Sequence, residues 1–181
     1  MGLAIVLGIV VLLAIFVVSN YNGLVRLREM VRNAMGQISA QIESRWDAVS
    51  NLIEATKQYS SHEAEVLRDI TASRSGINKD SSAREVEQDD AKFDSVMRQI
   101  NVVAEAYPDL KASEVYTNTM NSVNKYEENV RMSRMVYNDT VTKLNSKIQM
   151  FPTNIIASMF GFTKEEYFKS SSEKANMPSW S

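Results

Sequence analysis

Residues 1–18 read MGLAIVLGIVVLLAIFVV, and this stretch without a charged side chain decides the fold. The uncharged run continues to residue 25, and Arg26 is the first charge in the chain. Roughly 20 apolar residues cross a bilayer, and a span must be helical because hydrocarbon offers its backbone no hydrogen-bond partner. The sequence therefore predicts a transmembrane anchor over residues 1–22. Its membrane-facing side chains are expected to be Leu3, Ile5, Val6, Leu7, Ile9, Val10, Val11, Leu12, Leu13, Ile15, Phe16, Val17 and Val18.

Two other interpretations of this apolar run are weaker. A cleaved secretory signal carries basic residues before its apolar core and small residues at its cleavage site. Nothing basic precedes this run, and the cleavage pattern fits poorly. A buried core helix of a soluble protein normally keeps one polar face, and this run has none.

Three basic residues follow the anchor closely, namely Arg26, Arg28 and Arg32. They are placed to meet lipid headgroups and to orient the span. Lysine and arginine are enriched on the cytoplasmic side of membrane spans. The charge pattern therefore predicts a single-pass protein of the cell membrane, with its amino terminus outside and its helical domain in the cytoplasm.

The composition is typical of a helical chain, and its overall charge favours no particular class of partner. The 181 residues carry 20 basic and 22 acidic side chains, a net charge of −2, so no overall positive charge attracts nucleic acid. The absence of cysteine excludes disulfides, thiolate metal sites and a cysteine nucleophile. Three prolines and six glycines leave long stretches free to be helical. We expect one domain over residues 23–169 and a disordered polar tail over residues 170–181.

The chain beyond the anchor begins with a long amphipathic pattern. Gln41 and Arg45 interrupt it, and no proline occurs before Arg74. A three-four alternation of this kind is typical of helices in a coiled-coil-like bundle. We therefore expect one helix running from the membrane to about Arg74. Its apolar positions are Leu24, Leu27, Val31, Ala34, Ile38, Ala48, Leu52, Ala55 and Tyr59.

A turn-rich segment, SRSGINKDSS at residues 73–82, separates this helix from the next. Ser82 and Glu85 have the spacing of a capping box and predict a helix start. Pro108 disfavours helical geometry at Tyr107, so the second helix should end there.

A third helix is expected from Lys111 or Ser113 to the Phe151-Pro152 pair, followed by the short apolar segment TNIIASMF at residues 153–160. Thr163 and Glu166 offer another capping-box start for a last helical turn. The predicted fold is all-α: the transmembrane helix continues into a bundle of about three long antiparallel helices with a short C-terminal helix.

Few residues could carry chemistry. His62 is the single histidine, and a catalytic zinc site wants three protein ligands, so a metal site at His62, Glu63 and Glu65 is a weak alternative. No nucleotide-binding or hydrolase motif occurs, and we predict no cofactor and no catalysis. The acidic residues between Glu85 and Asp94 lack a calcium-loop pattern and are expected to form a solvated helix face.

Apolar residues also lie outside the stripe of the first helix. Trp46, Val49 and Ile53 form a second line, which we interpret as a self-association surface, because exposed apolar patches usually mark interfaces. A wider core covered by TNIIASMF is the alternative, and that segment could also dip into the membrane interface. Other apolar residues off the stripes are Val102, Val103, Met132, Met135 and Val136.

Several stretches resemble the LemA family, in the family's order: YNGLVRLREMVRNAMGQI, QIESRWDAVSNLIEATKQYSSHEAEVL, YPDLKASE and ENVRMSRMVYNDTVTKLNSKIQMFPTNIIASMFGF. Ser50 stands where family members usually have proline. Met35 stands where many of them have tryptophan. The resemblance implies a membrane segment, long antiparallel helices and no established catalytic residues. Some members resemble lipoproteins with a cysteine near Ser19 or Asn20, which would place their domain outside the cell.

The function expected from these observations is a membrane-anchored scaffold that self-associates or organises partners at the bilayer. A signalling adaptor acting through the long helix is the first alternative. A metal-dependent enzyme using His62 is the second.

Overall fold

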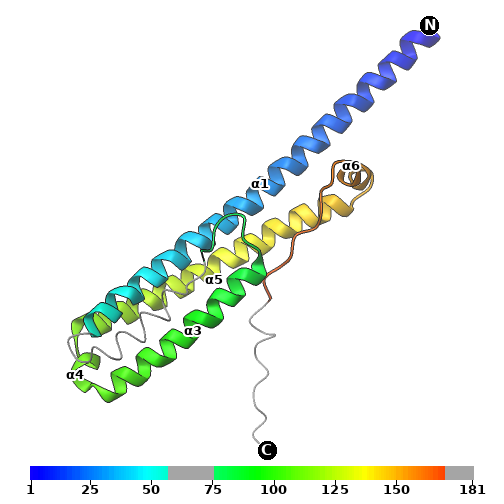
Figure 1. The fold of residues 1–181 in the computed structure, drawn as a ribbon. Helices are drawn as coiled ribbons and strands as arrows, with labels where there is room; N and C mark the ends of the chain where they lie inside the picture. The colour runs from blue at the N-terminus through cyan, green and yellow to red at the C-terminus, as the bar shows by residue number, and fades with distance from the viewer. Residues whose placement is uncertain (57–75, 170–181) are drawn as a thin grey trace, which may run out of the picture. The chain divides into compact units, whose positions relative to one another are not determined.

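The computed structural model describes residues 1–56 and 76–169, and every regular element in these ranges is a helix (Figure 1). The prediction of an all-α fold is confirmed. The helices are α1 (Gly2–Thr56), α3 (Ala83–Ala106), α4 (Pro108–Lys111), α5 (Glu114–Gln149) and α6 (Thr153–Met159). The chain forms two compact units, described separately below: an anchor unit of Met1–Asn33 with Val136–Ser181, and a bundle unit of Ala34–Met135.

Local signals fix the helix ends as expected. The backbone N–H of Glu85 donates to Oγ of Ser82 over 3.3 Å, and the N–H of Ser82 donates to the Glu85 carboxylate over 2.7 Å, so the capping box at α3 is complete. Helix α3 ends at Ala106, two residues before Pro108. Gly161, with a φ of 70°, follows α6 in the left-handed conformation that favours glycine. The predicted start and end of α3 are confirmed.

The bundle unit brings α1, α3 and α5 together. Contacts between α1 and the chain around α3 advance in the same direction, from Ser39 with Ile77 to Arg45 with Asp89, so the two helices run parallel. Contacts with α5 advance in opposite directions, as in the bond between Gln41 and Asn129, so α5 is antiparallel to both. The prediction of a helical bundle is confirmed, and within it α1 and α3 run parallel where antiparallel neighbours were expected.

The structure describes α1 as far as Thr56. The expected continuation of this helix to about Arg74, which includes Tyr59, lies outside the described residues.

The self-association surface predicted on α1 is also wrong as placed. Trp46, Val49 and Ile53 are exposed by only 1%, 0% and 2%, so they belong to the core of the bundle unit. The expected stripe has Gln41 as its next position after Ile38, but the buried residue is Ile42. The buried face of α1 is therefore shifted by one residue at this point. Helix α1 contacts both α3 and α5, so it buries a wider face than a two-helix seam would.

Candidate functional site

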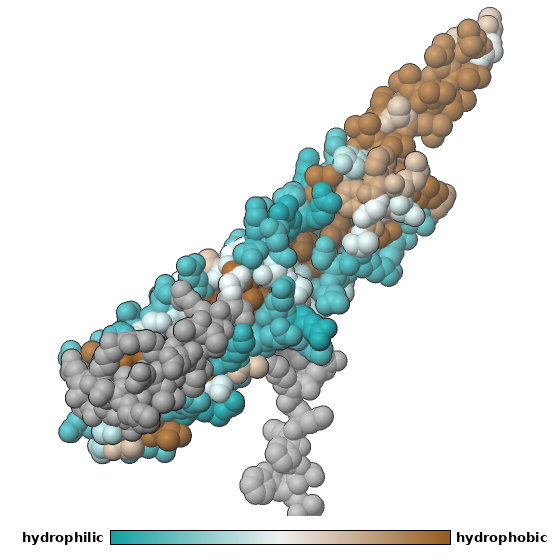
Figure 2. Space-filling model, in the orientation of Figure 1, coloured by the Kyte–Doolittle hydropathy of each residue, from teal (hydrophilic) through white to brown (hydrophobic). Residues whose placement is uncertain are grey.

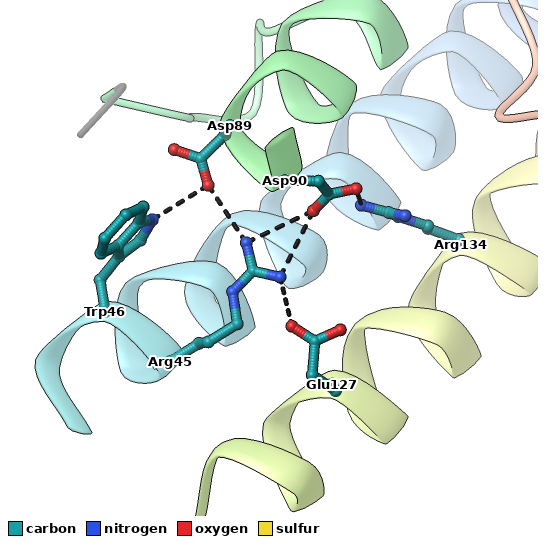
Figure 3. A network of polar contacts seen from close by, with 6 residues as sticks. All are labelled: Arg45, Trp46, Asp89, Asp90, Glu127 and Arg134. Atoms are coloured by element: carbon teal, nitrogen blue, oxygen red, sulfur yellow. Dashed lines mark hydrogen bonds and ion pairs between the residues drawn. The ribbon is translucent and has the colours of Figure 1, made fainter. Parts of the chain in front are cut away.

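The most unusual feature of the bundle unit is a charged cluster inside it, centred on Arg45 of α1 (Figure 3). Nη2 of Arg45 lies 3.2 Å from Oδ2 of Asp89, and Nη1 lies 3.3 Å from Oδ1 of Asp90, both on α3. Nη1 also donates to the carboxylate of Glu127 on α5. The side chain of Arg45 therefore joins all three long helices, with 2% of its surface exposed.

Two aromatic residues and a second arginine complete the cluster. Nε1 of Trp46 donates to Oδ2 of Asp89 over 3.0 Å. The guanidinium of Arg45 lies over the ring of Phe93, 4.0 Å from its centroid, in the geometry of a cation–π contact. Arg134 of α5 pairs with the other oxygen of Asp90. Figure 3 shows Trp46 and Arg45 directed toward Asp89 from adjacent positions of α1.

The electrostatics of this cluster favour a structural role. Among the described residues, its three carboxylates face two guanidinium groups. Removing ions from water costs several kcal/mol each, which pairing and hydrogen bonds must offset. These ion pairs and hydrogen bonds can form in only one alignment of the helices. The cluster therefore selects the register of α1 against α3 and α5.

The sequence patterns missed this cluster in two places. Arg45 was expected to interrupt the apolar stripe, and it occupies a buried position in it. Asp89 and Asp90, expected on a solvated face, are exposed by 0% and 9%, so that expectation is wrong for these two residues. The available signal was the seam spacing of Asp89 between Val86 and Phe93, opposite a seam arginine.

A second feature of the bundle unit is an open, polar hollow of about 350 Å³ beside α1 and α5. Its two serine hydroxyl groups are engaged by their own helices: Ser44 donates to the carbonyl of Ala40, and Ser122 donates to that of Asn118. Serine nucleophiles need an adjacent base, and His62, the single histidine, lies outside the described residues.

The predicted metal site cannot be placed. His62, Glu63 and Glu65 fall between residues 57 and 75, outside the described residues. Within residues 1–56 and 76–169, no group of three histidine or acidic side chains has the arrangement of a metal site.

The anchor unit contains the apolar part of α1. Helix α1 is long and apolar enough to cross a membrane, and none of the residues in its most apolar stretch is buried. The predicted anchor side chains are exposed by between 39% at Phe16 and 77% at Leu3, with Val17 half-buried. An apolar helix without a protein partner on any side fits a single-pass membrane protein.

The three arginines after the anchor have different surroundings. Arg26 is exposed. The guanidinium of Arg28 lies 5.2 Å from the ring centroid of Phe162, and Arg32 pairs with Glu29 over 3.2 Å. Their role at lipid headgroups stays a prediction.

Helix α6 packs beside the end of the apolar run of α1. The rings of Tyr21 and Phe160 lie 4.8 Å apart, and those of Tyr21 and Phe162 lie 5.8 Å apart. Oγ1 of Thr153 lies 3.1 Å from Oδ1 of Asn20, at hydrogen-bond distance. These contacts hold the α6 region against α1 where the apolar run stops.

Residues 162–169, here called the C-terminal strap, follow α6 along α5. The side-chain amide of Asn145 both donates to the carbonyl and accepts from the N–H of Glu165, each over 2.9 Å. Asn138 makes the same pair of bonds with Phe168, over 3.0 and 2.9 Å. The strap is not helical, so the helical turn expected at Thr163 is wrong.

The spacing of the two asparagines explains why the strap is extended. Asn145 lies seven positions after Asn138 on the helix, a rise of about 10.5 Å, and three positions of extended chain span about 10 Å. Two amides on one face of α5 therefore match backbone groups three residues apart in the strap. These long-range bonds override the local capping signal at Thr163 and Glu166.

Comparison with known proteins identifies the family. The family model described as LemA family matches residues 34–180, most of the chain.

The chain belongs to the LemA family.

The resemblance seen in the sequence is thereby confirmed. The chain is 29% identical over 155 residues to Protein LemA of Metamycoplasma hominis, covering 85% of this chain and 71% of that protein. It is also 29% identical over 80 residues to magnetosome protein MamQ 2 of Paramagnetospirillum magneticum, covering 44% of this chain and 29% of that protein. Neither the family description nor these names denote an enzyme.

Proposed function

We propose that this LemA family chain is a non-catalytic, membrane-anchored scaffold that self-associates or organises partners at the bilayer. The observation that carries the proposal is the change of environment along α1. Its first part exposes apolar side chains around the whole helix, and the part from Ala34 onward supplies core residues of a bundle. One helix thus serves as anchor and as building element of the domain.

The buried Arg45 cluster supports a scaffold rather than an enzyme. Its carboxylates are engaged by Arg45, Trp46 and Arg134, so these carboxylates join helices. A scaffold needs a domain with one fixed helix register, because partners recognise a fixed surface. The relatives named for the magnetosome carry the name of a cell structure rather than of a reaction.

For orientation, we keep the amino terminus outside and the domain in the cytoplasm. Arg26, Arg28 and Arg32 follow the anchor at the positions where the positive-inside rule applies. Protease added to intact spheroplasts tests this. The domain should resist digestion until the cells are lysed, and digestion of intact spheroplasts would establish the reverse orientation.

Self-association needs a surface other than Trp46, Val49 and Ile53. We place the contact with a second copy on α5, where Met132 and Met135 are exposed by 58% and 63% on one face of the bundle unit. Residues three apart share a helix face. Anchoring in one bilayer raises the effective concentration of copies for contact side by side.

Co-isolation of two differently tagged copies from one membrane tests this contact. We expect the copies to be isolated together, and Met132→Glu with Met135→Glu should reduce their association. Val102→Glu is the matched control, because Val102 is equally exposed but lies on α3. A double variant that associates like the original chain would exclude this surface.

The signalling adaptor is the alternative that one observation favours. Helix α1 continues without a break from Gly2 to Thr56, so it could carry a change of state from the anchor to Arg45. An adaptor can act as a monomer, whereas a self-associating scaffold cannot. Failure of the two tagged copies to associate would therefore favour the adaptor.

A further inference from the structure

The anchor unit exposes a second apolar surface besides the anchor itself. It consists of five side chains in and next to α6, exposed by between 50% and 80%, and we call it the α6 apolar face: Met150, Phe151, Ile155, Met159 and Phe160. The opposite side of α6 is buried through Thr153, Ile156 and Ala157. Large contiguous apolar surfaces of this kind mark contacts with another molecule or with a membrane.

The position of α6 along α1 identifies what covers this face. Phe160 contacts Tyr21, and Thr153 contacts Asn20, so α6 lies level with residues only two or three beyond Val18. The eighteen apolar residues of α1 rise about 27 Å, close to the roughly 30 Å of a hydrocarbon core. The end of that run therefore coincides with the membrane boundary, and α6 lies at the same level.

We infer that the α6 apolar face is a second membrane contact, which inserts into the interfacial layer of the bilayer leaflet at the exit of the anchor. The inference rests on the proposed membrane anchoring. Amphipathic segments bury their apolar side about 5 to 10 Å into the boundary between headgroups and acyl chains. Tyr21 is an aromatic residue of the type enriched at that boundary.

The face is continuous with the anchor surface, as Figure 2 shows for the apolar surface around α6 and the neighbouring part of α1. A second protein copy could cover it instead, but such a copy would have to displace the lipid that surrounds the adjacent anchor. Insertion of the face fixes the anchor unit to the membrane at two points. This limits rotation of the unit about the axis of α1.

The absence of cysteine makes the test direct, because each single-cysteine variant of the full chain carries one label. Met159→Cys reports on the α6 apolar face, Leu12→Cys on the anchor, and Val102→Cys on an apolar side chain of the bundle unit with similar exposure. Each variant is labelled with an environment-sensitive fluorophore and reconstituted in vesicles of phosphatidylcholine and phosphatidylglycerol. Quenching by doxyl-labelled lipid is compared with quenching by iodide, at a high and a low protein-to-lipid ratio.

We expect doxyl lipid to quench the label at position 159 and iodide to spare it, at both ratios, with the opposite pattern at position 102. Iodide quenching at position 159 equal to that at position 102 would overturn the inference. Protection at position 159 that disappears at the low protein-to-lipid ratio would also overturn it, because a second copy would then be the cover. The label at position 12 reports separately on the anchor, so loss of lipid quenching there would contradict the proposed anchoring itself.

Discussion

Nη2 of Arg45 and Oδ2 of Asp89 lie 3.2 Å apart, with both side chains almost completely withdrawn from solvent. This ion pair joins the parallel helices α1 and α3, and Trp46 donates a hydrogen bond to the same carboxylate oxygen. An isolated buried charge is strongly unfavourable, so neither residue tolerates loss of the other. The pair therefore makes the bundle unit specific for one helix register.

Replacement of Arg45 by methionine should destabilise the bundle unit severely. Asp89 and Asp90 would each lose their ion pair with Arg45, while Asp90 keeps Arg134, and breaking a buried pair from one side costs roughly 3 to 5 kcal/mol. Thermal or urea unfolding followed by circular dichroism measures the change. Arg131→Met is the matched control, since Arg131 pairs with Glu128 on the exposed surface of the same bundle unit, and its unfolding midpoint should not move. Equal midpoints for the two variants would contradict the role assigned to the cluster.

Replacement of Asn145 by alanine should loosen the C-terminal strap. The variant loses two bonds to the backbone of Glu165, each contributing about 1 kcal/mol. Hydrogen exchange followed by mass spectrometry should show faster exchange at Glu165 and little change in α3. Asn124→Ala, at an exposed position of α5, should leave this exchange unchanged. Unaltered protection at Glu165 in the Asn145 variant would show that other contacts hold the strap.

The buried phenol of Tyr137 should make the stability of the anchor unit depend on pH. Burial of the side chain, with smaller contributions from the carboxylates of Glu165 and Glu166, raises the pKa of Tyr137 to about 12. In the unfolded chain the phenol ionises near the ordinary tyrosine pKa of 10.0. The folded state thus binds this proton more tightly, so its contribution is complete below pH 10 and is lost as the pH rises toward 12.

The comparison with Tyr137→Phe isolates this contribution from that of other groups. The variant keeps a ring against Phe168, whose centroid lies 5.0 Å from that of Tyr137. The difference in unfolding free energy between the original chain and the variant should therefore shift in favour of the variant above pH 10. A difference that stays constant from neutral to alkaline pH would contradict the buried state of the phenol.

His62 tests the metal-dependent enzyme directly. We predict that His62→Ala and Glu63→Gln leave the cellular phenotype of the protein largely intact, because Val66 stands where a zinc-protease helix has its second histidine and the second and third zinc ligands are missing. The purified chain should also contain no stoichiometric zinc by elemental analysis. Loss of the phenotype at normal abundance and normal helicity, together with loss of bound metal, would support the enzyme instead.

Local signals made several helix ends predictable from the sequence. The capping box at Ser82 and the boundary at Pro108 act within a few residues, so no knowledge of the fold was needed. The apolar run of α1 was equally clear, since length and lack of charge identify a membrane span without tertiary information.

Features that depend on distant residues were not predictable in this way. Trp46, Val49 and Ile53 lie off the first apolar stripe, which predicts a surface for them, whereas they are buried in the bundle unit. The carboxylates of α3 make the neighbouring Arg45 a core residue. The local helix signal at Thr163 was overridden by Asn145, which lies eighteen positions earlier in the chain. The parallel course of α1 and α3 likewise follows from contacts between residues far apart in sequence.

The mass of the intact protein extracted in a mild detergent tests the scaffold most directly. Light scattering corrected for bound detergent gives the protein mass of the particle, and a single chain contributes 20.4 kDa. We predict a particle that contains more than one copy, which becomes smaller when Met132 and Met135 are both replaced by glutamate. A particle of one chain, from membranes in which the protein is folded and anchored, would contradict the self-associating scaffold.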